Sequence, residues 1–368
     1  MGTSRRRFLG LTAAAVGSAA VGMATPASAK CRASSTLYLG TYTASPGGGT
    51  GIGLASYDVA SGQLTSTGVL AGVQNPSFLI LSRSGRSLYA VNEQAPGGVT
   101  AIAVDSPGKL RVLNRQPNGG SAPCHLDLVA NGKYLVSANY SSGDLAVHPV
   151  RADGSLGQQT DLVKHAGAAP HAHQVLQDPT GNYVLAVDLG TDSIYTYTIA
   201  NGKLTLRSQA KVKAGAGPRH LAFHPNGRYA YVAGELDSTI TVCRYDGSTG
   251  KITPGAAQST IPAGSPANYP GEVIVSPDGR FVYLTNRGHN SVAVFAVEPG
   301  GAYLRRIGTP SCGGDWPRHV TLDPTGQLMF VSNQKSNNIA TFQVDARTGG
   351  LTPKTSFSAP IPVCVLPG

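Results

Sequence analysis

The sequence predicts an all-β protein folded as a seven-bladed β-propeller. Its composition favours strands joined by tight turns: charged residues make up 13% of the 368 residues, against about 25% in a typical globular domain. Short runs of Val, Tyr, Leu and Thr are bounded by Gly, Pro, Asn and Asp throughout the chain, which is the pattern of an all-β protein. Two sequence motifs then repeat at the spacing of propeller blades.

The first motif is a turn between two strands, as in "SRSGRSLYAVNE" from Ser82 and "HPNGRYAYVAGEL" from His224. Its glycines are Gly85, Gly132, Gly181, Gly227, Gly279 and Gly326. Consecutive copies are therefore 47, 49, 46, 52 and 47 residues apart. A repeat of this length holds about four short strands, which is the content of one propeller blade.

The second motif is a strand that begins with Gly-x-Leu or a close variant, and it occurs seven times. Its apolar positions are Leu64, Leu110, Leu156, Leu204, Ile252, Leu304 and Leu351. Their spacings are 46, 46, 48, 48, 52 and 47 residues. Seven copies of this strand predict seven blades, and a β-sandwich would not show this regularity.

Strands from both ends of the chain are predicted to close the ring. "STLYLGTYT", from Ser35 to Thr43, supplies the one missing copy of a second strand, and "APIPVCVLP", from Ala359 to Pro367, supplies an innermost strand for the same blade. Closure of this kind removes exposed sheet edges, which otherwise favour aggregation.

The first 29 residues have the pattern of a twin-arginine export signal that is cleaved after Ala29. "TSRRRFLG" precedes a weakly apolar Ala/Gly-rich stretch, and Ala27-Ser28-Ala29 fits the small-x-small cleavage rule. The stretch is too short and too rich in glycine to favour a membrane span. We therefore expect a secreted bacterial protein in which residues 30–368 form a single propeller domain.

Several classes of partner are disfavoured by the charge pattern. The leader contains three arginines and no acidic residue, so its removal lowers the net charge from +10 to +7. The remaining cations are scattered, whereas a nucleic-acid groove needs them clustered. We expect a monomer that binds a small anionic molecule and has neither a nucleic-acid partner nor a stable membrane association. The five cysteines allow either a Cys31–Cys364 disulfide or buried free thiols.

Polar residues gather at one predicted mouth of the propeller axis. Arg219 begins an innermost strand and Glu235 follows the next strand, so antiparallel pairing brings both to the same face. His220 follows Arg219 directly, and the same segments of other blades carry His125, His171, His173, Glu272, Asn286, Arg287, Arg318 and His319. Alternation along the strands points His220 away from Arg219, and we expect His220 and His319 to brace neighbouring blades.

Several ordered segments resemble the lactonase family of seven-bladed propellers, which includes propeller-type 6-phosphogluconolactonases and carboxy-muconate lactonizing enzymes. These segments are "PHAHQ", "DLGTD", "GPRHLAFHPNGRYAYV", "GEL", "SPDGRFVYLTNRGHNSVAVF" and "WPRHVTLDPTG". The resemblance implies that His171, Arg219, Glu235 and Arg287 are the catalytic residues. The mouth position of His125, His173, Glu272, Asn286 and Arg318 makes them candidates for substrate binding.

The residue types agree with lactone hydrolysis. That reaction needs a base to activate water and cations to stabilise the oxyanion. Either Glu235 or His171 can be the base, and Arg219 and Arg287 can supply the positive charge. No serine or cysteine lies in a nucleophile-elbow motif, so direct attack by water is expected, with Cys124 as the covalent alternative.

Two other functions use the same residues. A lactonizing isomerase would run the chemistry in reverse, and a non-catalytic propeller would only bind its ligand. The resemblance implies no cofactor or metal, although His171, His173 and Glu235 could form a zinc site. Export disfavours a cytoplasmic substrate such as phosphogluconolactone, so an extracellular sugar lactone or an aromatic-degradation lactone is expected.

Overall fold

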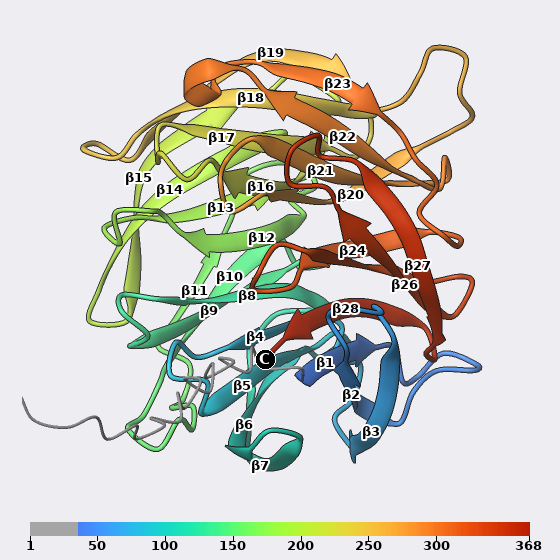
Figure 1. The fold of residues 1–368 in the computed structure, drawn as a ribbon. Helices are drawn as coiled ribbons and strands as arrows, with labels where there is room; N and C mark the ends of the chain where they lie inside the picture. The colour runs from blue at the N-terminus through green and yellow to red at the C-terminus, as the bar shows by residue number, and fades with distance from the viewer. Residues whose placement is uncertain (1–35) are drawn as a thin grey trace, which may run out of the picture. The chain divides into compact units, whose positions relative to one another are not determined.

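A computed structural model describes residues 36–368 as seven four-stranded antiparallel sheets, the blades of a propeller (Figure 1). The predicted leader and Cys31 lie outside the described residues. Blade 1 combines β28 (Pro362–Pro367), β1 (Thr36–Thr41), β2 (Gly51–Tyr57) and β3 (Leu64–Ala71). Blade 2 consists of β4 (Leu79–Leu81), β5 (Ser87–Asn92), β6 (Gly98–Ser106) and β7 (Lys109–Pro117).

The other five blades are also continuous in sequence. Blade 3 consists of β8 (Pro123–Val129), β9 (Tyr134–Asn139), β10 (Asp144–Pro149) and β11 (Asp161–Lys164). Blade 4 consists of β12 (Ala172–Gln177), β13 (Val184–Asp188), β14 (Ser193–Ala200) and β15 (Lys203–Lys211). Blade 5 consists of β16 (Pro218–Phe223), β17 (Tyr229–Gly234), β18 (Thr239–Asp246) and β19 (Lys251–Ser259).

Blades 6 and 7 complete the set. Blade 6 consists of β20 (Tyr269–Val275), β21 (Phe281–Arg287), β22 (Ser291–Val297) and β23 (Leu304–Gly308), with the short 3-10 turn η1 (Pro299–Gly301) before β23. Blade 7 consists of β24 (Pro317–Leu322), β25 (Leu328–Asn333), β26 (Asn338–Val344) and β27 (Leu351–Ser358). None of the helical structure in residues 36–368 is long and apolar enough to cross a bilayer.

The ring closes as predicted, with the last strand of the chain beside the first. β28 pairs with β1 through Leu37↔Pro367, Leu39↔Val365 and Gly40↔Cys364, and Figure 1 shows the red C-terminal strand next to the blue N-terminal one. The innermost strands contact their neighbours around the axis, and β28 contacts both β24 and β4. The predicted seven-bladed fold is confirmed.

The hydrophobic core is divided among the interfaces between blades. Seven apolar clusters lie within residues 36–368, and each is built from two neighbouring blades. Val136 of blade 3 and Val184 of blade 4 belong to one of them. The outermost strands are largely exposed, as the burial of β3 and β7 shows. Each blade is thus held by both of its neighbours.

The repeated turn motif fixes the direction of each innermost hairpin. In blade 5 the N–H of Gly227 donates to the carbonyl of His224 at 2.9 Å, and Gly227 has φ +67°. A side chain disfavours this left-handed conformation, which explains the recurring glycine. The turn lies on one face of the propeller, so the opposite face carries the start of each innermost strand and the end of the next strand. We call this opposite face the site face.

A second recurring contact ties the two strand ends together on the site face. The N–H of Glu235 donates to the carbonyl of Gly217 at 2.9 Å, and Gly217 precedes Pro218 with φ +57°. The equivalent bond in blade 3 joins Tyr140 to Ala122 at 2.9 Å, and that in blade 7 joins Gln334 to Trp316 at 3.0 Å. The residue that follows each of these second strands is therefore held beside the start of the innermost strand.

The innermost strands are not regular, which bears on the predicted direction of their side chains. The pairing register shifts between Pro218 and Leu221 in blade 5, and comparable shifts occur in β8, β12, β20, β24 and β28. A bulge of this kind breaks the two-residue alternation of side chains. The expectation that His220 points away from Arg219 assumed regular alternation, and the bulge in β16 removes the basis for that assumption.

Candidate active site

Arg219, Glu235 and Arg287 form an ion-paired cluster on the site face. The Oε2 atom of Glu235 lies 3.3 Å from Nε of Arg219 and 2.9 Å from Nη2 of Arg287. Arg219 comes from β16, Glu235 follows β17, and Arg287 ends β21, so the cluster joins blades 5 and 6. The Glu235 side chain is 17% exposed, while those of Arg219 and Arg287 are 3% and 5% exposed. The structure brings together three of the four residues predicted to be catalytic.

Arg287 is fixed by further hydrogen bonds to the backbone. Its Nε donates to the carbonyl of Tyr269 and its Nη2 to the carbonyl of Pro270, both at 2.9 Å. Burial and then the positive charge of Arg219 lower the pKa of Arg287 to about 9, although Glu235 opposes the shift. Burial, and next the charge of Arg318, also lowers the pKa of Arg219. Two closely held cations on one carboxylate create a site that attracts anions.

His171 is oriented by Tyr140 of the neighbouring blade. Its Nδ1 lies 2.9 Å from the carbonyl oxygen of Tyr140, and its ring stacks on the Tyr140 ring with centroids 4.6 Å apart. Because a carbonyl oxygen only accepts, Nδ1 carries the proton, and Nε2 of the neutral ring has a free lone pair. The N–H of His171 also donates to Oδ1 of Asp188 at 3.0 Å. His171 is thus held in the tautomer that can accept a proton at Nε2.

His125, His173, His220 and His319 form a layer of buried histidines on the innermost strands. The ring centroids of His125 and His173 lie 5.2 and 5.0 Å from that of His220. His220 Nδ1 is 2.8 Å from Glu272 Oε1 in the next blade, and the N–H of Val365 in blade 1 donates to His319 Nδ1 at 3.4 Å. The predicted bracing of blades by His220 and His319 is confirmed, and Glu272 is the partner of His220.

These four histidines make stability depend on pH. Burial is the main cause that lowers the pKa of His125, His173, His220 and His319 below the ordinary value of 6.5. A histidine kept neutral in the fold but free to protonate when unfolded stabilises the protein above the unfolded pKa. That contribution is lost as the pH falls below about 6.5.

We therefore expect urea unfolding to show a falling free energy of unfolding between pH 7 and pH 5. Each of these histidines can contribute up to about 1.4 kcal/mol per pH unit over its titration range. A His125→Phe variant, which packs a non-titrating ring against Phe78, should show a smaller decrease over the same range. An equal decrease in both proteins would contradict this assignment.

Two predicted substrate-binding residues have different environments. The Arg318 side chain is 17% exposed, and its Nη2 lies 3.9 Å from Oε2 of Glu93. Asn286 is fully buried: its Nδ2 donates to Thr260 O and Ser291 Oγ, and its Oδ1 accepts from Asn268 Nδ2. The amide is therefore engaged by blade 6 and by the segment that connects blade 5 to it. These contacts favour a structural role for Asn286 over the predicted contact with substrate.

Three residues near the site were not among those expected to be catalytic or to bind substrate: Tyr42, Glu93 and Tyr140. The hydroxyl of Tyr42 lies 3.0 Å from both carboxylate oxygens of Glu93. All three residues occupy the position that Glu235 has in blade 5, directly after the second strand of a blade. This shared position could have identified them in the sequence.

The cysteines of the described chain are unpaired. Cys124, Cys243, Cys312 and Cys364 are free and buried. Burial raises the pKa of the Cys124 thiol, and its Sγ lies 3.3 Å from the carbonyl of His173. Cys124 is therefore a neutral thiol and a poor nucleophile. Within residues 36–368, no three His, Cys, Asp or Glu residues are grouped so that they could hold a metal ion.

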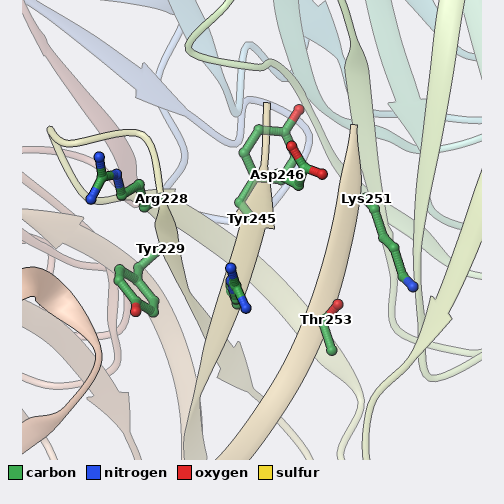
Figure 2. A pocket seen from close by; sticks show the side chains of 7 residues that line it. Arg228, Tyr229, Tyr245, Asp246, Lys251 and Thr253 are labelled. Carbon is green, nitrogen blue, oxygen red and sulfur yellow. The ribbon is translucent and has the colours of Figure 1, made fainter. Parts of the chain in front are cut away.

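A surface hollow of about 570 Å³ lies elsewhere on blade 5 (Figure 2). It is lined by Arg228, Tyr229, Arg244, Tyr245, Asp246, Lys251 and Thr253. Arg228 and Tyr229 precede or begin β17, whereas Glu235 follows the other end of that strand. The hollow therefore lies at the turn end of the blade, and its exposed cations have no contact with the predicted catalytic residues.

Comparison with known proteins identifies close relatives over almost the whole described chain. The family model described as "Lactonase, 7-bladed beta-propeller" matches residues 36–367. The 6-phosphogluconolactonase of Bacillus subtilis is 38% identical over 340 residues, which cover 89% of this chain and 97% of that protein. A 6-phosphogluconolactonase of Formosa agariphila is 31% identical over 291 residues, which cover 74% and 82% of the two chains.

A solved structure with the same architecture is also similar in sequence. The periplasmic gluconolactonase of Pseudomonas aeruginosa superposes with a TM-score of 0.85 and is 30% identical. The match covers 90% of this chain and 98% of that one.

Proposed function

The chain belongs to the family of seven-bladed β-propeller lactonases, and we propose that it is an exported enzyme that hydrolyses a sugar-type or related lactone. The observation that carries this proposal is the cluster in which Glu235 holds the guanidinium groups of Arg219 and Arg287 together on the site face. Relatives named 6-phosphogluconolactonase support the reaction class, because such enzymes open a cyclic ester with water.

His171 is the proposed general base. Its Nδ1–H is engaged by the carbonyl of Tyr140, so Nε2 can take a proton from water as the water oxygen attacks the lactone carbonyl. The oxyanion that forms is stabilised by the positive charges of Arg219 and Arg287. When the intermediate collapses, the bond from the carbonyl carbon to the ring oxygen breaks. The proton on His171 then passes to the departing alkoxide, which gives a hydroxy acid.

Glu235 is proposed to position the two arginines. Its Oε2 is shared between Arg219 and Arg287, so the lone pairs of that oxygen already face two cations. His171 is in the tautomer that leaves Nε2 able to accept a proton, because its Nδ1–H donates to the Tyr140 carbonyl. This difference favours His171 over Glu235 as the base, and the neutral, buried Cys124 favours direct hydrolysis over an acyl-enzyme.

The predicted leader at residues 1–29 supports a substrate outside the cytoplasm. A similar protein from Pseudomonas aeruginosa is named a periplasmic gluconolactonase, which agrees with that location. We therefore propose an extracytoplasmic sugar lactone as the natural substrate in preference to a cytoplasmic metabolite.

Acid release from a panel of aldonolactones, phosphogluconolactone and muconolactones, followed by pH-stat with residues 30–368, tests this function. We expect turnover of at least one lactone, and Arg219→Ala should lower kcat/KM by about 10²- to 10³-fold because a cation at the oxyanion is lost. Glu235→Gln should lower it as well. The matched controls are Glu298→Gln and Arg305→Ala, which break an exposed ion pair of 3.1 Å.

Activity that persists in both site variants would place the reaction elsewhere. A folded wild-type protein that hydrolyses none of the lactones in the panel would contradict the lactonase assignment for these substrates. Ring closure of a muconate without hydrolysis would identify the isomerase alternative.

A further inference from the structure

Asp188 is a buried carboxylate that holds the backbone of His171. It ends β13 of blade 4, and its side chain is 0% exposed. Its Oδ1 accepts hydrogen bonds from the N–H groups of His171 at 3.0 Å and of Thr191 at 2.9 Å, and its Oδ2 lies 2.6 Å from Nδ1 of His165. Burial by itself would raise the pKa of Asp188, but these hydrogen bonds lower it below its ordinary value. Both oxygens of an ionised carboxylate are thus used, as burial of a charge requires.

His165 connects this carboxylate to the neighbouring blade. It directly follows β11 of blade 3, and its side chain is also 0% exposed. Because an ionised carboxylate can only accept hydrogen bonds, Nδ1 of His165 donates to Asp188. The His165 ring stacks on Tyr195 of β14 with centroids 4.0 Å apart, and its backbone N–H donates to the carbonyl of Gly143 at 3.0 Å. Asp188 is therefore held from blade 3 as well as from its own blade.

The turn that follows Asp188 packs against the His171 ring. Asp188 closes this turn through the Thr191 N–H, and the N–H of Leu189 donates to the carbonyl of His171 at 3.0 Å. Gly190 lies so close that a Cβ atom on it would be 2.8 Å from Cδ2 of His171. Cδ2 is bonded to Nε2, the proposed proton acceptor. The turn is therefore held against that edge of the ring.

The fold does not require a charge at the position of Asp188. Near the end of the second strand, the other blades have Thr41, Asn92, Asn139, Gly234, Asn286 and Asn333 there. In blades 2, 6 and 7 the asparagine donates to a backbone carbonyl of the segment that leads into the same blade, as Asn333 does to Cys312 at 3.1 Å. A carboxylate cannot donate in this way. Among the seven described blades, only blade 4, which carries His171, has an acidic residue at this position.

The hydrogen bond to His171 also distinguishes blade 4. In blades 3, 5 and 7 the residue in the same place is Ala122, Gly217 and Trp316, and its N–H donates to the preceding blade. These three residues have left-handed backbone with φ of +52°, +57° and +63°, whereas His171 does not. In blade 4 the N–H donates to Asp188 of the same blade instead. The place of the His171 backbone thus depends on this carboxylate.

We propose that Asp188, supported by His165, is a positioning residue that fixes His171 for proton transfer. The inference rests on the proposed function and adds two residues to the same site. Nδ1 of His171 keeps its 2.9 Å hydrogen bond to the Tyr140 carbonyl of blade 3 only while the His171 backbone stays in place. A displacement of about 1 Å at a reacting group can lower the rate about 100-fold. Asp188 is buried away from solvent and acts only through His171.

Asp188→Ala is expected to lower kcat by about 10- to 100-fold and to change KM much less. It removes the acceptor of two backbone N–H groups, so His171 is no longer held, while Arg219 and Arg287 come from blades 5 and 6 and keep their places. Asp188→Asn retains an oxygen that can accept from both N–H groups. It should recover most of the lost kcat, and initial rates on the best lactone measure both constants.

Asn333→Ala is the matched control, because it removes the equivalent side chain and its 3.1 Å hydrogen bond to Cys312 from blade 7. Urea unfolding should show that both alanine variants are less stable than wild type, but kcat should stay near the wild-type value in Asn333→Ala. His165→Phe keeps a ring against Tyr195 and removes the donor to Asp188, and it should also lower kcat if Asp188→Ala fails to fold. Equal losses of kcat in Asp188→Ala and Asn333→Ala would overturn the proposal.

Nuclear magnetic resonance supplies a measurement that needs no turnover. In residues 30–368 with isotope-labelled histidine, the shifts of the ring nitrogens report which one is protonated, and His171→Asn identifies the His171 signals. Wild type and Asn333→Ala should show the Nδ1–H tautomer, and Asp188→Ala should show a mixture with the Nε2–H form. An unchanged tautomer in Asp188→Ala would refute the positioning role. A changed tautomer in a protein that hydrolyses no lactone would reject the proposed function and leave the positioning of His171 by Asp188 standing.

Discussion

Replacement of His171 by asparagine is expected to lower kcat by about 10²- to 10⁴-fold, the usual contribution of a general base. The asparagine amide can still donate to the Tyr140 carbonyl, which accepts from Nδ1 of His171 at 2.9 Å. It has no nitrogen lone pair at the position of Nε2. The variant therefore removes the proton acceptor and keeps the local hydrogen bond, so KM should change by much less than kcat. Initial rates on the lactone that wild type hydrolyses best measure both constants.

Two further proteins make the His171 result specific. His171→Ala leaves space beside Tyr140, and added imidazole should restore part of its activity. His224→Asn is the matched control, because His224 Nε2 also contacts a backbone carbonyl, that of Gly279 at 3.1 Å, but lies in the turn opposite the site face. Near-normal kcat in His171→Asn would return the role of base to Glu235.

Removal of residues 362–368 is expected to abolish the native fold. This deletion takes away β28, the innermost strand of blade 1, and with it the buried side chains of Val363, Cys364 and Val365. Each fully buried valine contributes about 1.5–3 kcal/mol, against a typical net stability of about 5–15 kcal/mol for a whole domain. The deletion also exposes the inner edge of β1 and opens the apolar clusters on both sides of blade 1.

Thermal unfolding followed by circular dichroism, together with size-exclusion chromatography, measures this effect. The truncated chain should lose its cooperative transition or aggregate. A chain that lacks only Gly368 is the control: it loses the 2.9 Å hydrogen bond from the Gly368 N–H to the Thr36 carbonyl but keeps β28. Cooperative melting of the longer deletion within a few degrees of wild type would show that the ring does not depend on its last strand.

Much of this architecture is encoded in local sequence. The seven copies of the Gly-x-Leu strand gave the number of blades. The turn glycines gave their spacing, because each must adopt the same left-handed conformation, as Gly227 does with φ +67°. Antiparallel pairing alone predicted that Arg219 and Glu235 lie on the same face of the propeller. These predictions needed only strand direction, which short-range patterns determine.

Other features depend on contacts between blades and could not be predicted in this way. The bulge between Pro218 and Leu221 changes which side chains face the axis, and hydrophobic alternation does not reveal it. The tautomer of His171 depends on a carbonyl 31 residues away. Glu93 and Arg318 meet only because closure places blades 2 and 7 on either side of blade 1. The burial of the Asn286 amide likewise depends on its partners Thr260 and Asn268.

The pairing of β1 with β28 also determines when the nascent chain can complete blade 1. The partner that β1 needs on its inner side begins at Pro362, and translation at about 5–20 residues per second takes roughly 16 to 65 seconds to reach it. During that interval β1 has an open edge that invites wrong pairing, and Tyr42 cannot take its final place beside Arg318. A chain released before Pro362 lacks the innermost strand of blade 1, so closure of the propeller requires translation through β28.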